Sequence, residues 1–212
     1  MRTKPMKLLY VMDPLCGWCY GNARTIERLA DAFSSAYEFE ILPGGMITAP
    51  NTRTQTTSFR NYVVAADRRI TEMTGAEFGE AYVDSLNDAS LLLDSEPPSR
   101  AIVAVKAIKP ESALRAASAI QRARFVEGKD LNNEESYRSV CGSADVEWNE
   151  FTAAFRSESI RLTTQQAFAR ARKRTSGFPT LLLDHGDSAC VLAHGYASYE
   201  HVASKLESLV AG

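Results

Sequence analysis

The first forty residues alternate between short apolar runs and one segment of helical spacing. Lys7–Met12 is apolar and partly β-branched or aromatic, which predicts a buried strand. Residues 16–34 carry apolar side chains close to helical spacing, and residues 37–42 then alternate as a second strand. Two strands joined by a helix are expected to be parallel, with a right-handed crossover.

The last forty residues return to the strand pattern. Residues 181–183 and 189–192 are apolar runs on either side of a turn-rich link, which predicts a hairpin. Ser198 is placed to cap a final helix. Together with the first two strands, the hairpin predicts an α/β fold with a mixed sheet of about four strands and a C-terminal helix.

The long middle of the chain has almost entirely helical spacing. Apolar residues recur on one face at Phe59, Val63, Ala66 and Ile70, and similar stripes continue as far as Arg174. We therefore expect a helical insertion over residues 58–174. It would interrupt a discontinuous domain formed by residues 1–57 and 175–212.

Composition and charge exclude several classes of partner. A chain of 212 residues with 45% hydrophobic content can bury one substantial core. A net charge of −2 and a pI near 6.0 give no basic surface for nucleic acid or an anionic membrane, so we expect neither as a partner. No apolar stretch approaches the roughly 18 residues that a membrane-spanning helix needs.

The N-terminus and the cysteine count favour a cytoplasmic location. Residues 1–7 are basic like the start of a signal peptide, but the apolar run that follows is needed as the first strand and ends at Asp13-Pro14. We therefore expect no cleaved signal peptide. Four cysteines, of which two lie close together, do not form a disulfide scaffold.

Those two cysteines carry the strongest chemical signal in the chain. Pro14 ends the first strand, and the predicted helix begins near Cys16, with Cys19 one turn further on. Unpaired N–H groups and the helix dipole stabilise a thiolate at a helix N-terminus. Cys16 is therefore the expected nucleophile, and Cys19 the thiol that resolves a mixed disulfide on Cys16. Gly17 and Trp18 between them would tune the redox equilibrium.

Other uses of paired cysteines need residues that this sequence does not offer. A zinc site needs about four ligands, and the remaining candidates, among them Cys141 and Cys190, are isolated. Haem attachment needs a histidine where Tyr20 stands, and iron–sulfur clusters need more clustered cysteines. The pair could also be merely buried. We expect Cys141 and Cys190 to be small buried hydrophobes.

A second local signal lies far along the chain, at Gly177-Phe178-Pro179-Thr180. Pro179 stands at the start of a predicted strand, where it removes no interior ladder bond. A proline in such a place is most often trans. Its partnership with the dithiol makes a cis Phe178-Pro179 bond the better expectation.

The two motifs resemble the DsbA-like branch of the thioredoxin superfamily, and in particular its small cytosolic members described as protein disulfide isomerases. The resemblance implies a thioredoxin-like fold in which the loop of Phe178, Pro179 and Thr180 packs beside the dithiol and binds a peptide. It implies thiol- or disulfide-containing proteins or peptides as partners. It also implies no cofactor beyond the redox-active disulfide, with glutathione as a possible co-substrate. The polar loop after the second strand would run near the dithiol.

One position departs from that family pattern. Thioredoxin and DsbA keep a buried acid six residues before the first cysteine, where this chain has Tyr10. Asp13 is the nearest carboxylate and a candidate for proton transfer. It also resembles an aspartate of kappa-type glutathione transferases and 2-hydroxychromene-2-carboxylate isomerases. Alternatively, Asp13 is a turn residue or helix cap ahead of Pro14.

The sequence thus favours a thiol–disulfide oxidoreductase and leaves two alternatives. In a reducing cytosol, reduction or isomerisation of disulfides is more plausible than net oxidation. One alternative is a glutathione-dependent isomerase or transferase, although one activated group would suffice there and Cys19 would be superfluous. The other is a non-catalytic adaptor, against which the intact dithiol argues.

Overall fold

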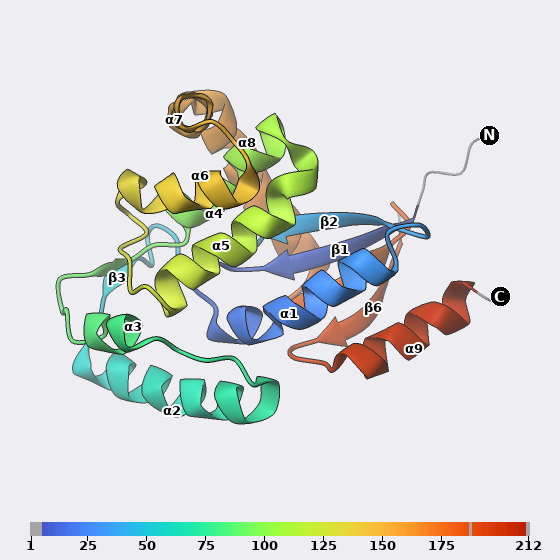
Figure 1. The fold of residues 1–212 in the computed structure, drawn as a ribbon, viewed down its shortest axis with the longest axis horizontal. Coiled ribbons are helices and arrows are strands. Elements are labelled where there is room, and N and C mark those ends of the chain that lie inside the picture. The colour runs from blue at the N-terminus through green and yellow to red at the C-terminus, as the bar shows by residue number, and fades with distance from the viewer. Residues whose placement is uncertain (1–5, 187, 211–212) are drawn as a thin grey trace.

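A mixed sheet of four strands lies at the centre of the computed structural model, which describes residues 6–186 and 188–210 (Figure 1). The strands lie in the order β2-β1-β5-β6 and are β1 (Lys7–Met12), β2 (Glu38–Pro43), β5 (Thr180–Asp184) and β6 (Ala189–His194). β1 is parallel to β2 and antiparallel to β5, which is antiparallel to β6. This confirms the predicted sheet. The basic N-terminal segment, residues 1–5, lies outside the described residues, as does position 187 in the hairpin link.

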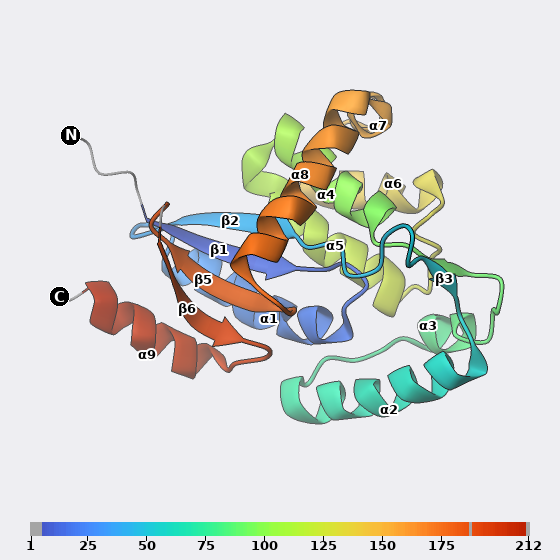
Figure 2. The ribbon, with the colours of Figure 1, turned by 180° about the vertical axis from the view of Figure 1, so that it is seen from behind.

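Helices cover both faces of the sheet because the side chains of β1 alternate between them. Leu8, Tyr10 and Met12 point into the main core, on the side of α1 (Gly17–Ala32) and α9 (Tyr199–Val210) (Figure 1). Leu9 and Val11 point the other way, into a smaller cluster that α8 (Glu158–Arg174) covers (Figure 2). The two central strands, β1 and β5, are therefore buried on both faces, as the continuous apolar run of β1 requires.

The segment between β2 and β5 is helical with one exception. Its elements before α8 are α2 (Thr57–Thr74), α3 (Glu80–Ser85), α4 (Glu96–Ile108), α5 (Ala113–Phe125), α6 (Arg138–Ala144) and α7 (Trp148–Arg156), with 3-10 turns at Pro110–Ser112 and Glu134–Tyr137. The exception is an antiparallel pair of two-residue strands, β3 (Arg53–Thr54) and β4 (Leu92–Leu93). Two residues are too few for periodicity to reveal a strand, so the sequence did not indicate this pair.

The insertion shares the core of the sheet. One continuous cluster of buried side chains includes Leu8 of β1 and Ile26 of α1 together with Ile102, Tyr137 and Phe151 of the insertion. A shared core fixes the insertion helices relative to the sheet, since interiors packed like crystals do not deform freely. Side chains from the insertion can therefore take defined positions beside α1. In the part of the chain that the structure describes, no helix has both the length and the apolar character to cross a membrane.

The two isolated cysteines differ in their surroundings. Cys141 on α6 is buried as predicted, and burial raises the pKa of its thiol to about 11. Cys190 is exposed, so its predicted burial is wrong. The reason is that β6 is an edge strand whose only buried residue is Leu192.

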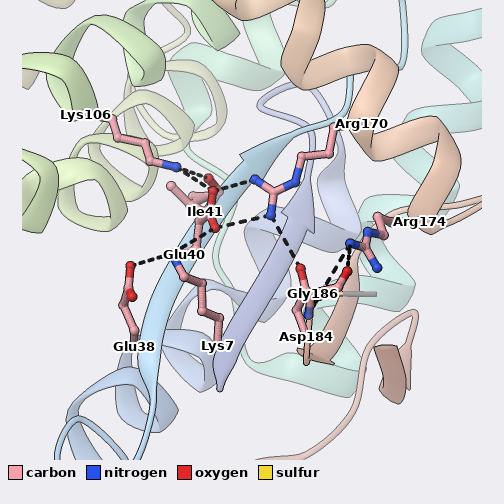
Figure 3. Close-up of polar contacts among 9 residues, drawn as sticks. All are labelled: Lys7, Glu38, Glu40, Ile41, Lys106, Arg170, Arg174, Asp184 and Gly186. Carbon is pink, nitrogen blue, oxygen red and sulfur yellow. Dashed lines mark hydrogen bonds and ion pairs between the residues drawn. The ribbon is translucent and has the colours of Figure 1, made fainter. Parts of the chain in front are cut away.

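A buried carboxylate ties the insertion to the sheet (Figure 3). Glu40 of β2 accepts hydrogen bonds from Arg170 of α8 at 2.6 Å and from Lys106 of α4 at 2.9 Å, and Lys7 of β1 lies 3.7 Å away. Arg170 also approaches Asp184 of β5 at 3.5 Å. Burial raises the pKa of Glu40, but the bonds and charges of Arg170 and Lys106 outweigh it and lower the pKa to about 2.

We expect Glu40→Gln to lower the free energy of unfolding at neutral pH by about 1–2 kcal/mol, because it removes the largely buried charge that Arg170 and Lys106 share, and these two cations are themselves partly exposed. The folded pKa of about 2 lies below the usual 4.5, so this stabilisation is complete above pH 4.5 and is lost as pH falls toward 2. Urea unfolding at a series of pH values measures the difference. The matched control is Glu38→Gln, which removes a half-exposed partner of Lys7 and should cost less than about 1 kcal/mol. If the two variants lost the same free energy of unfolding, Glu40 would not be the main ionic link between the insertion and the sheet.

Candidate active site

The dithiol stands where β1 ends and α1 begins. The chain turns through Asp13, whose carbonyl accepts the N–H of Cys16 at 3.1 Å. Cys16 is the N-cap of α1, and its Sγ accepts the N–H of Cys19 at 3.3 Å. One of the unpaired amides of the helix N-terminus therefore points at the Cys16 sulfur.

The two thiols differ in access to solvent. Both are free, and Cys16 is 7% exposed whereas Cys19 is 0% exposed. Burial, and next the contact with Cys16, raise the pKa of the Cys19 thiol well above its usual range. A disulfide in solution can thus reach Cys16 first, while Cys19 stays protonated behind it.

Tyr10 lies under the dithiol, at the position where thioredoxin and DsbA have a buried acidic residue. Its hydroxyl lies 3.5 Å from the carbonyl oxygen of Cys19, and burial raises the pKa of the phenol well above its usual range. Asn22 of α1 is buried beside it. The base of the site therefore holds neutral polar groups rather than a carboxylate.

The proline loop meets the dithiol, although 162 residues separate them in sequence. The carbonyl oxygen of Phe178 lies 3.8 Å from Sγ of Cys16, and the Phe178–Pro179 peptide bond is cis. The Phe178 ring lies over Gly44, where an added Cβ would come within 2.0 Å of it. The carbonyl of Pro179 accepts the N–H of Gly195 at 2.8 Å, which ties the loop to the end of β6.

Thr180 holds this loop from inside the sheet. It is buried as the first residue of β5, and its hydroxyl donates to the carbonyl of Gly177 at 2.8 Å. The same oxygen lies 2.8 Å from the hydroxyl of Thr175 and 3.0 Å from Nδ1 of His194. The contacts of Thr175 and His194 with Thr180 could not be predicted from the sequence, because only the folded sheet brings these residues together.

The Asp13 carboxylate is completely buried and joins three segments. Oδ1 accepts the N–H of Leu15 and the hydroxyl of Ser95 at 2.9 Å each, and Oδ2 accepts the N–H of Met46 at 2.6 Å. Ser95, directly before α4, also exchanges bonds with the backbone of Ile47. Burial raises the pKa of Asp13, and these three hydrogen bonds oppose that rise. These contacts are those of a residue that holds a turn, and a role for Asp13 in proton transfer stays a prediction.

A cleft of about 270 Å³ opens on the other side of Cys16, between the start of α1 and the insertion. Its lining includes Cys16, Gly17 and Trp18 together with Asp67 of α2 and Arg124 of α5. Gly17 makes this arrangement possible, since an added Cβ would come within 3.0 Å of Ile70 and 3.3 Å of Oδ1 of Asp67. The spacer residues of the dithiol thus also form one wall of the cleft.

The sequence reasoning missed the polar residues of this cleft. Asp67 accepts a hydrogen bond from the buried Tyr82 at 3.0 Å, and Arg124 donates to Gln55 and Ser85 at 3.0 Å each. One signal was available: Asp67 lies within the apolar face of its helix, next to Ala66 and one turn from Val63. An acid at such a position is usually exposed, so its burial indicates a specific partner or ligand.

The comparisons with known proteins agree with this geometry. The family described as DSBA-like thioredoxin domain matches residues 7–207. No curated protein matches the chain. Among solved structures, a candidate protein disulfide isomerase from Nitrosomonas europaea is 26% identical with a TM-score of 0.87, and the match covers 98% of each chain.

Two further structures widen the comparison. The cytosolic disulfide reductase DsbM from Pseudomonas aeruginosa is 29% identical with a TM-score of 0.75, over 97% of this chain and 100% of that one, and DsbM is also solved with glutathione. A 2-hydroxychromene-2-carboxylate isomerase has a TM-score of 0.60 at 14% identity, over 96% of this chain and 94% of that one. At that identity the likeness concerns the fold alone.

We expect Asp13→Asn to lower the free energy of unfolding by about 2–4 kcal/mol. The carboxylate accepts hydrogen bonds on both oxygens, whereas the NH₂ group of an asparagine would face one of the present donors and leave that donor without an acceptor. Ser95→Ala removes one of those donors and should cost only about 1 kcal/mol. Urea denaturation followed by circular dichroism measures both variants. If Asp13→Asn were as stable as the unmodified protein, the carboxylate would not hold the turn.

Proposed function

This chain belongs to the DSBA-like thioredoxin domain family, and within that family we propose that it is a thiol–disulfide oxidoreductase that reduces or isomerises disulfides through Cys16 and Cys19. The observation that carries the proposal is the asymmetry of the two thiols. Cys16 caps α1 and keeps a small exposed fraction, whereas Cys19 is completely buried one turn behind it with its N–H directed at the Cys16 sulfur.

The exchange proceeds in two displacements. The Cys16 thiolate attacks one sulfur of the substrate disulfide, the substrate S–S bond breaks, and the leaving sulfur takes up a proton. Cys19 then loses its proton and attacks Sγ of Cys16, which releases the second substrate sulfur as a thiol. Two electrons have passed to the substrate, and a Cys16–Cys19 disulfide remains.

The proline loop and the two residues between the cysteines support the binding of a substrate at Cys16. The Phe178 carbonyl, 3.8 Å from the Cys16 sulfur, is a backbone acceptor for an extended peptide. Pro179 and Thr180 fix that carbonyl in place through their bonds to Gly195 and Gly177. Gly17 and Trp18 adjust the redox equilibrium through the stability of the Cys16 thiolate.

We propose that the protein works in the cytoplasm in the reducing direction. The cytosolic reductase DsbM, whose structure was also solved with glutathione, is among its structural neighbours. Two molecules of glutathione would reduce the Cys16–Cys19 disulfide and leave as oxidised glutathione, so no bound cofactor is needed. The cytosolic glutathione pool, poised at about −220 to −320 mV, supports this direction.

A glutathione-dependent isomerase is the second candidate, supported by a fold likeness to 2-hydroxychromene-2-carboxylate isomerase. Such an enzyme needs one group that activates glutathione and has no use for a buried second thiol. Turnover of a small glutathione conjugate by Cys19→Ser would favour this candidate over the dithiol mechanism.

We expect Cys16→Ser to reduce insulin-disulfide reduction, with glutathione as electron source, to below about a hundredth of the original rate, because the attacking sulfur is gone. Cys19→Ser should accumulate a mixed disulfide on Cys16, which mass spectrometry of the intact protein detects. Cys190→Ser and Cys141→Ser are the matched controls, an exposed and a buried cysteine outside the site, and should retain the full rate. Activity that survives the loss of Cys16 would refute the mechanism.

A further inference from the structure

The cleft beside Cys16 contains a buried carboxylate with a free oxygen. Asp67 is 9% exposed, and its Oδ2 is bonded to Tyr82. Oδ1 faces the backbone of Gly17, and among the described residues nothing donates a hydrogen bond to it. Oδ1 is not among the buried atoms that lack a partner, so it is accessible from the cleft and can accept a hydrogen bond from a ligand bound there.

Two arginines line the same cleft, and they differ in how many of their N–H donors are available to a ligand. Arg124 is buried, spends donors on Gln55 and Ser85, and lies 5.1 Å from the Tyr82 ring. Arg53 is exposed, with its guanidinium 5.8 Å from the Phe59 ring, and no ion pair involves it among the residues described. The cleft lining therefore includes one buried anion and, among the residues described, one exposed cation without an ion pair.

The size of the cleft limits the ligand. Its volume of about 270 Å³ is slightly below the roughly 300–1,000 Å³ of pockets for drug-sized molecules. An amino-acid-sized group fits, whereas a folded protein segment does not. Because Cys16 also lines the cleft, a group bound there can carry a sulfur to the nucleophile.

We propose that this cleft is a subsite for the amino-acid end of a small disulfide, whose ammonium group binds Asp67 and whose carboxylate binds Arg53. The proposal rests on the function proposed above and names one class of substrate for it, disulfides of amino-acid thiols. Burial raises the pKa of Asp67 to about 6, so its carboxylate is still largely ionised at pH 7.5. The proline loop, on the other side of Cys16, remains available to the other half of the disulfide.

The test uses four disulfides that share a two-carbon arm and differ in their charged groups. Cystine carries both the ammonium and the carboxylate, cystamine the ammonium, 3,3′-dithiodipropionate the carboxylate, and bis(2-hydroxyethyl) disulfide neither. The reduced protein, in excess, reacts with each in a single turnover, so no further reductant is needed. Dividing each rate constant by that of the same disulfide with dithiothreitol corrects for intrinsic reactivity.

We expect the unmodified protein to prefer cystine over bis(2-hydroxyethyl) disulfide by roughly tenfold or more after this correction. In Asp67→Asn, the corrected rate constant for cystamine should fall close to that for bis(2-hydroxyethyl) disulfide. In Arg53→Met, the corrected rate constant for 3,3′-dithiodipropionate should fall close to that for bis(2-hydroxyethyl) disulfide. Glu72→Gln, which removes an exposed acid from α2 outside the cleft, should leave every ratio unchanged.

Two other outcomes would overturn the subsite, and a third would count against the proposed function. Equal corrected rates for all four disulfides in the unmodified protein would overturn the subsite without any variant, and would leave the oxidoreductase function intact. A uniform loss for all four in Asp67→Asn would also overturn it, since Asp67 would then act on Cys16 itself. Failure of all four to oxidise the dithiol would instead count against the proposed function.

Discussion

The buried carboxylate of Asp13 holds together the three segments that form the site. It fixes the turn before Cys16 through Leu15, the loop after β2 through Met46, and the start of α4 through Ser95. A carboxylate can accept several hydrogen bonds at once, which makes it suited to join segments that cannot pair with one another. Asp13 thus holds the turn that leads into α1, where the N–H of Cys19 faces the Cys16 sulfur.

Cys16 stands between two surfaces with different chemistry. On one side the Phe178 carbonyl offers a backbone acceptor, and on the other Asp67 and Arg53 offer charge in a small cleft. A disulfide has two halves, and a site of this kind can hold each half by different means. The Glu40 network in the middle of β2 ties α4 and α8 of the insertion to the sheet (Figure 3).

Local patterns predicted the sheet, the helical insertion and the dithiol, because strand, turn and helix signals lie within a few residues of each other around Cys16. They did not reveal β3 and β4, which are too short for periodicity. Nor did they predict that Asp67 borders the dithiol, since that contact depends on how α2 packs against Gly17. Cys190 shows the same limit, because a strand pattern does not say which strand lies at the edge of a sheet.

The reduction potential of the Cys16–Cys19 pair tests most directly whether this dithiol works as a reductant. The purified protein is equilibrated with glutathione buffers of known ratio, and the fraction of oxidised dithiol is measured by alkylation and mass spectrometry. For a reductant we expect a potential at or below about −200 mV, in the range of glutaredoxins and thioredoxin. A potential above about −150 mV, near that of the oxidant DsbA, would contradict it.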